Sequence, residues 1–180
     1  MFMWLRLRAL LRHLWQDSAD TRRAIDDSML ERLRAQVAAS EARHTGEIRI
    51  HVEAALPRPY MWRHLRDATP MATLVRERAT DMFGELRVWD TQHNNGVLIY
   101  LLLVEHEIQL VADRGLNDIV DRPQWQAMVQ RMGLAFARGQ FEDGLLQAVQ
   151  EVAAPLTTHF PALAQAQTNP NELPDTPTRG

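Results

Sequence analysis

The chain has 180 residues, with 20 basic and 23 acidic side chains and a formal net charge of −3. All of the basic residues are arginine, and neither lysine nor cysteine occurs. These counts exclude a disulfide framework, a thiolate zinc site, an iron–sulfur cluster, a cysteine nucleophile and a phosphate loop that ends in lysine. A slightly acidic chain is a poor general nucleic-acid binder, and 46% apolar residues at this length suit one globular domain.

Residues 1–15 predict an amphipathic basic helix. Arg6, Arg8 and Arg12 give this segment a charge of +3, so the rest of the chain carries −6. On a helical wheel the large apolar side chains gather in one arc, opposite most of the arginines. That arc contains Met3, Trp4, Leu7, Leu10, Leu11, Leu14 and Trp15. The pattern is typical of a helix at an interface.

The same helix is a poor membrane span or signal peptide, because arginines interrupt the apolar run and no small-residue cleavage site follows. Three roles stay open for it: packing on the domain or on a second subunit, lying on a membrane surface, or forming a flexible tail. We expect Trp4, Leu7, Leu11 and Trp15 to make the contacts in the first two cases. The absence of lysine has two explanations. Either coding bias favours arginine throughout, or arginine is selected at particular positions for its planar guanidinium group and its behaviour at interfaces.

The chain divides into a helix and acidic connector (1–27), an α/β domain (28–160) and a tail (161–180). Within the domain, hydrophobic periodicity, helix caps and turn residues predict a series of helices and strands with one irregular stretch. In order, these are a helix from Ser28 to His44, a strand at 47–53, an irregular stretch at 57–69, a helix at 70–88, strands at 97–104 and 107–111, and helices from Asp121 and at 141–160.

Two features of these segments define the expected sheet. Residues 97–104 are a continuous apolar run, which is typical of a central strand covered on both faces. Only two residues separate this strand from the next, which forces an antiparallel pair. In the strand at 47–53, Ile48, Ile50 and Val52 should face inward and His51 the surface. The tail, which contains Pro170, Pro174 and Pro177, should be disordered.

Polar residues cluster in sequence at the open end of the predicted hairpin. Asp90, Asn94 and Asn95 precede the first of its strands, and Asp113 follows the second. Carboxylate and amide oxygens suit Ca²⁺ or Mg²⁺, with a lean towards Ca²⁺ in a flexible loop site. The predicted metal-site residues are Asp90, Asn94, Asp113, Asp118 and Asp121. The alternative is that these residues only cap a helix, form a turn or make a local ion pair.

Four segments, in the same order between residues 29 and 160, resemble the TPM domain family. They are 46–50, 95–103, 111–116 and 141–145, with the motifs Asn-Gly-Val-Leu, Asp-Arg-Gly and Phe-x-x-Gly-Leu. The resemblance implies a three-layer α/β/α sandwich around a mixed parallel and antiparallel sheet, here with an extra N-terminal amphipathic helix. The family includes a thylakoid-lumen protein of photosystem II repair described as an acid phosphatase, bacterial relatives that bind calcium, and non-catalytic accessory proteins of membrane complexes.

The chain departs from many relatives in two ways. It has no recognisable signal peptide or C-terminal span, and Asp113-Arg114-Gly115 replaces their Gly-Tyr-Gly. We therefore expect a cytoplasmic protein, with peripheral attachment to the inner face of the inner membrane as an option.

Three functional hypotheses follow. The first is a non-catalytic accessory protein that binds a membrane surface or membrane complex through its N-terminal helix and through Tyr60 and Trp62. The second is a metal-assisted phosphatase for phosphate monoesters, with no catalytic residue identified. The third is a soluble homodimeric module. We expect no organic cofactor and no nucleic-acid partner.

Overall fold

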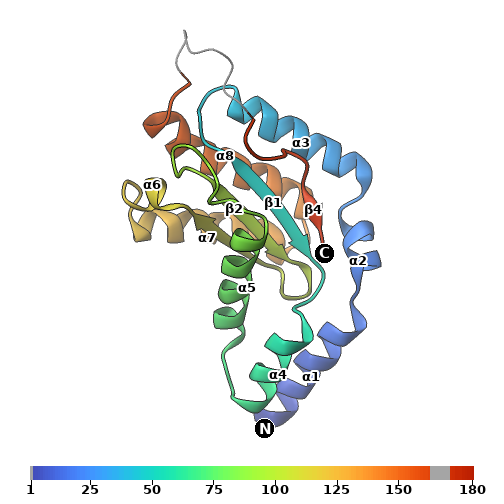
Figure 1. Cartoon of the computed structure of the whole chain (residues 1–180). Coiled ribbons are helices and arrows are strands. Elements are labelled where there is room, and N and C mark those ends of the chain that lie inside the picture. Colours follow the sequence, from blue (N-terminus) through green and yellow to red (C-terminus); the bar gives the residue numbers. More distant parts are fainter. Residues whose placement is uncertain (1, 163–170) are drawn as a thin grey trace.

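The structure is a computed structural model, and it describes residues 2–162 and 171–180 (Figure 1). Its centre is a four-stranded mixed sheet in the order β3-β2-β1-β4. The strands are β1 (Ile48–Glu53), β2 (Val97–Leu102), β3 (Glu107–Ala112) and β4 (Thr178–Arg179). β1 runs parallel to both β2 and β4, and β3 runs antiparallel to β2 with Val97 opposite Ala112. The predicted antiparallel hairpin and mixed sheet are confirmed.

Helices cover both faces of this sheet. They are α1 (Phe2–Trp15), α2 (Ser18–Ala24), α3 (Asp27–Glu41), α4 (Arg58–Arg66), α5 (Met71–Glu85), α6 (Arg114–Asn117), α7 (Arg122–Ala137) and α8 (Phe141–His159), with a 3₁₀ turn at Leu103–Glu105. α3, α7 and α8 pack on one face, and α5 packs on the other. The molecule is therefore the expected α/β/α sandwich with an additional N-terminal helix.

Strand periodicity assigns the core residues to the two faces. Ile48, Ile50 and Val52 face the layer of α3, α7 and α8, while Leu98 and Tyr100 face α5. All six residues of β2 are buried, as the continuous apolar run predicts.

Two helix assignments needed correction. α3 begins at Asp27 rather than Ser28, because the Asp26 carboxylate caps it by accepting a hydrogen bond from the Met29 N–H at 2.8 Å. The stretch 57–69, which the sequence predicts to be irregular, contains α4. Pro59 lies in the first turn of α4, where its missing N–H costs no hydrogen bond.

The prediction of a disordered tail is wrong for residues 171–180, and residues 163–170 of that tail lie outside the described part of the chain. Leu173 is only 7% exposed, and β4 adds to the edge of β1. The Glu47 carboxylate accepts the Leu173 N–H at 3.2 Å, and Val52 accepts the Gly180 N–H at 2.9 Å. Partners more than a hundred residues away in sequence hold this proline-rich segment in place.

The surface position predicted for His51 is also wrong. Arg49, His51 and Glu53 are all at least 93% buried, although their alternation with apolar residues predicts an outward face. The tail covers Arg49 and His51: Arg49 donates to the carbonyl of Pro174, and the imidazole of His51 lies 2.8 Å from the Thr178 hydroxyl. Glu53 lies beneath α5, where Arg78 donates to it at 2.9 Å.

Candidate functional site

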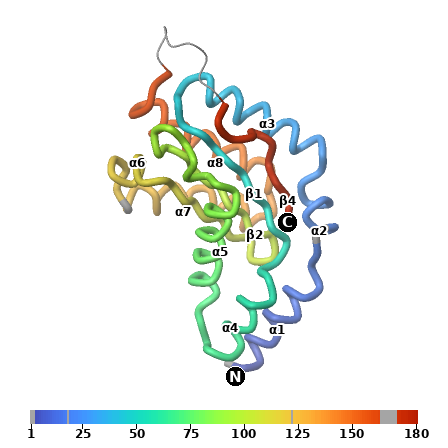
Figure 2. Tube along the Cα trace, in the orientation of Figure 1, coloured from blue at the N-terminus to red at the C-terminus, as the bar shows by residue number. Residues whose placement is uncertain are grey.

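α1 and α4 lie side by side at one end of the molecule, beyond the edge of the sandwich (Figures 1 and 2). Glu105, at the hairpin turn, holds α1 in place by accepting hydrogen bonds from Arg12 and, at 2.9 Å, His13. His13 itself is buried and accepts the Leu56 N–H at 3.0 Å. Burial raises the pKa of Glu105, but the bonds from His13 and Arg12 outweigh it, so that the pKa is lowered overall.

The contact between α1 and the domain uses a narrow stripe of the helix. Ala9 and Leu10 pack against the core, and His13 is buried beside them. This arrangement leaves most of the predicted apolar arc facing solvent. Its exposed members are Met3, Trp4, Leu7, Leu11, Leu14 and Trp15, with Trp15 85% exposed. Leu5, outside the arc, is exposed as well. A folded domain seldom leaves so many large apolar side chains of one helix in water, which marks α1 as an interaction surface.

The two aromatic residues predicted to assist α1 have different environments. Trp62, on α4, is 59% exposed. Tyr60 is half-buried, and its hydroxyl donates to Asp81 on α5 while Arg78 lies over its ring at 6.0 Å. Burial, and secondarily Asp81, raises the pKa of Tyr60. Trp62 is therefore available to a partner, whereas Tyr60 joins α4 to α5.

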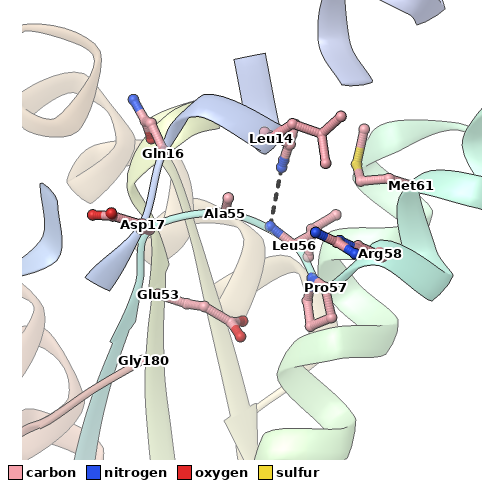
Figure 3. A pocket seen from close by; sticks show the side chains of 12 residues that line it. Leu14, Gln16, Asp17, Glu53, Ala55, Leu56, Pro57, Arg58, Met61 and Gly180 are labelled. Atoms are coloured by element: carbon pink, nitrogen blue, oxygen red, sulfur yellow. Dashed lines mark hydrogen bonds between the residues drawn. The ribbon is translucent and has the colours of Figure 1, made fainter. Parts of the chain in front are cut away.

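A small cavity of about 270 Å³ lies where the end of α1 meets the domain (Figure 3). Leu14, Gln16 and Asp17 line it from the N-terminal side, and the loop 54–58 and Gly180 close the other sides. The hydrogen bond from the Leu56 backbone to α1 crosses this region. The cavity is thus lined jointly by the end of α1, by Glu53 and by Gly180.

The open end of the hairpin brings together two of the predicted metal-site residues, Asn94 and Asp113. The Gly115 N–H donates to the Asn94 carbonyl at 2.9 Å, and the Arg114 guanidinium donates to the Asn94 side-chain oxygen at 3.0 Å. A Cβ on Gly115 would lie 2.5 Å from the Asn94 carbonyl oxygen, so the close approach of these loops requires glycine there.

Two oxygens at this end are shielded from water and lack a hydrogen-bond partner. They are Oδ2 of Asp113 and Oδ1 of Asn95. The other carboxylate oxygen of Asp113 accepts the Arg114 N–H at 2.7 Å and so starts α6. Such unsatisfied oxygens are uncommon, and hard cations use oxygen donors of this kind. Asn95 is not among the predicted metal-site residues.

The other three predicted metal-site residues have roles or positions of their own, apart from Asn94 and Asp113. Asp121 caps α7 by accepting the Gln124 N–H at 2.9 Å, Asp118 is exposed at the end of α6, and Asp90 is exposed in the loop after α5. Across residues 2–162 and 171–180, no three His, Asp or Glu side chains form a group that could hold a metal. Any metal site at the hairpin end would thus depend on Asp113 together with amide and backbone oxygens.

A buried polar group beneath α5 was not predicted from the sequence. Glu53 accepts hydrogen bonds from Arg78, at 2.9 Å, and from the Tyr100 hydroxyl, at 2.6 Å. Burial and the neighbouring Glu53 raise the pKa of Tyr100 far above its usual range. The group joins α5 to the sheet, and this structural role explains why charged residues lie in the core.

Comparison with known proteins shows the family of this chain. The sequence model of the TPM domain family matches residues 18–154, and the chain belongs to this family. The structure is similar to the NMR structure of the BA42 protein from the psychrophilic bacterium Bizionia argentinensis, with a TM-score of 0.70 and 26% identity. The match covers 87% of this chain and 95% of that one. No curated protein gave a match. α1 lies before the region that the family model matches.

Proposed function

We propose that this TPM-domain protein is a non-catalytic accessory module that attaches to an anionic membrane surface through α1. The observation that carries the proposal is the exposed apolar arc of α1, which is bordered by arginine. Arg8 is exposed on the solvent side of the helix, next to Trp4 and Trp15 on the helical wheel. A helix with Trp and Leu on one face and Arg beside it inserts shallowly between anionic headgroups.

The geometry of the protruding end supports this role. α4, next to α1, carries exposed Trp62 together with exposed Arg58, Arg63 and Arg66. An arginine without an acidic partner contributes about 1 kcal/mol to attachment near an anionic surface, a contribution that salt screens. Arg63 and Arg66 are paired with Glu77 and Asp67, which reduces their share. None of the helices in the described residues is long and apolar enough to cross a bilayer. Attachment would therefore be peripheral, reversible and sensitive to ionic strength.

Vesicle co-sedimentation of the full chain tests the proposal. We expect binding to vesicles with about one third phosphatidylglycerol, and binding at least about tenfold weaker to phosphatidylcholine alone or at 0.5 M salt. Leu11→Glu places a charge in the exposed arc and should abolish binding. Leu134→Glu is the matched control, because Leu134 is 64% exposed on α7.

Equal binding by Leu11→Glu and the wild type would contradict the proposal. So would light scattering that shows a dimer which Leu11→Glu dissociates, since the arc would then be a subunit interface.

A second candidate function is binding of a divalent metal, with Ca²⁺ preferred, at the open end of the hairpin. The two buried oxygens without partners, on Asp113 and Asn95, favour it. Oxygen donors suit Ca²⁺, but one carboxylate with neutral oxygens makes a weak site, because affinity rises with ligand charge. Metal-assisted hydrolysis of a phosphate monoester is the activity that such a site would permit.

A thermal titration tests this second candidate. Millimolar Ca²⁺ should raise the melting temperature of the wild type by mass action. Asp113→Asn should remove this increase while keeping the cap on α6, because asparagine also caps helices. Asp118→Asn is the control and should respond to Ca²⁺ as the wild type does. Flat curves for the wild type would remove both the metal site and metal-assisted hydrolysis.

A further inference from the structure

A groove of about 960 Å³ runs along the outer edge of β3. α5 and α7 both pack against β3, one on each face of the sheet, and they form the two walls. Ala72, Thr73 and Arg76 line the groove from α5, and Trp125, Val129 and Gln130 line it from α7. Its floor contains Gln109, Leu110 and Ala112 of β3 itself.

The backbone of β3 presents unpaired groups to this groove. The Asp113 N–H donates to the carbonyl of Gly96 at 2.9 Å, and the two residues lie opposite each other in the antiparallel ladder. In such a ladder alternate residues point their N–H and C=O groups towards the neighbouring strand. Gln109, Val111 and Asp113 thus face β2, whereas Leu110 and Ala112 face the groove.

Within residues 2–162 and 171–180, one side chain bonds to the backbone groups of β3 that face outward. Asn117 of α6 donates to the Ala112 carbonyl at 2.7 Å, which confirms that this carbonyl points away from β2. Within the described residues, β2 is the one strand that pairs with β3, so no strand pairs with Leu110 on its outer side. A sheet edge with free N–H and C=O groups is a template for an added strand.

We infer that this groove binds an extended peptide segment of a partner protein, which adds to β3 as a further strand. The walls specify the side chains of that segment, because successive side chains of a strand point to opposite faces. Trp125, Val129 and Leu110 form an apolar wall, and the Trp125 indole N–H is buried without a partner. Arg76, Thr73 and Gln109 form a polar wall with a positive charge.

The partner segment is therefore amphipathic. The residues that line the groove include Arg76 and no acidic side chain, although Gln109 donates to Glu107 at its border at 2.8 Å. Arg76 therefore favours a segment with an acidic residue on its polar side. The segment would be about six residues long, which matches the length of β3. The opposite edge of the sheet shows the same mode of binding within the molecule, where the tail adds to β1 as β4.

A labelled six-residue peptide that alternates valine with threonine and glutamate is a suitable probe for the full chain. We expect fluorescence anisotropy to show binding below 1 mM, and NMR to show amide shifts at residues 108–112. The same peptide with N-methyl groups on alternate amides should bind at least about tenfold more weakly, because it cannot pair with the strand. Arg76→Glu should weaken binding about fivefold, and Arg22→Glu, an exposed change on α2, should leave it unchanged.

Three results of the peptide titration would overturn the inference. They are no binding of the probe at 1 mM, equal binding of the N-methylated peptide, and amide shifts that map to β1 instead of β3. Concentration-dependent dimerisation that broadens residues 108–112 would also overturn it, because a second copy would then occupy the edge.

Discussion

The two edges of the sheet differ in how their outward backbone groups are satisfied. At β1, the Ile48 N–H donates to the Glu41 carboxylate at 2.9 Å, the Ile50 carbonyl accepts from the Thr178 hydroxyl, and the Val52 carbonyl accepts from Gly180. At β3, Asn117 bonds the Ala112 carbonyl and Leu110 faces a groove. One edge is closed by the chain's own side chains and tail, while the other is left open to a partner.

The closed edge buries a cluster of carboxyl groups. Closing β1 buries Glu41 and Glu47 near Asp175, with Arg49 as the nearby cation. Burial raises the pKa of Glu41 to about 8, and the neighbouring Glu47 and Asp175 add to the effect although the bond from Ile48 opposes it. Burial also raises the pKa of Glu47. The folded state therefore favours the protonated form of these carboxyls, although the bonds that Glu47 accepts from the tail favour its charged form.

Proline substitution on β3 should distinguish residues whose N–H bonds to β2 from residues whose N–H faces the groove. It should also give the largest change in unfolding free energy. Val111→Pro removes an N–H that bonds to β2 and should lower the free energy of unfolding by about 3 kcal/mol or more. Ala112→Pro removes an N–H that faces the groove and should cost only about 1 kcal/mol. Urea unfolding measures both. Equal losses for the two variants would show that the outer side of β3 is also paired.

Shortening Leu173 tests how much the tail contributes to the closed edge. Leu173 is 7% exposed and packs with Leu98 and Tyr100 in the core. Leu173→Ala should cost about 2–4 kcal/mol of unfolding free energy, because it leaves a cavity in a buried site. The control Leu134→Ala alters a side chain that is 64% exposed and should change stability by less than about 0.5 kcal/mol. Similar values for the two would mean that the tail contributes little.

The pH dependence of stability tests the carboxyl cluster at β1. Because the pKa of Glu41 is about 8 in the folded chain and lower in the unfolded chain, its protonated form favours folding. Stability should therefore fall as the pH rises from about 5 to 8.5. Glu41→Gln keeps an oxygen for the Ile48 N–H and should flatten this dependence. If Glu41→Gln loses stability with rising pH as steeply as the wild type, Glu41 is not the cause of the pH dependence.

Much of the sandwich was predictable because local periodicity and turn residues determine it. The continuous apolar run of β2 and the short turn after it predict a central strand and an antiparallel neighbour, and both are found. Hairpin geometry likewise predicts that the loop before β2 meets the segment after β3, where Arg114 donates to the Asn94 side-chain oxygen. Asp118 and Asp121 follow Asp113 closely in sequence, but α6 and the cap of α7 direct them elsewhere.

The features that sequence reasoning missed depend on contacts between distant segments. Nothing local in the alternating strand at 47–53 shows that Arg49 and His51 will be covered by a tail rich in proline. Nor does periodicity show which face of α1 packs on the domain. His13 is buried there and Leu10 is half-buried, and a wheel ranked by hydrophobicity alone places Leu7 and Leu11 ahead of His13.

Amide hydrogen exchange, measured by NMR on the full chain without added peptide, tests the difference between the two edges most directly. We predict that the Leu110 amide exchanges at least about a hundredfold faster than those of Gln109, Val111 and Ile48, because it alone of the four has no acceptor in the part of the chain that the structure describes. A Leu110 amide as protected as that of Val111 would contradict an open β3 edge.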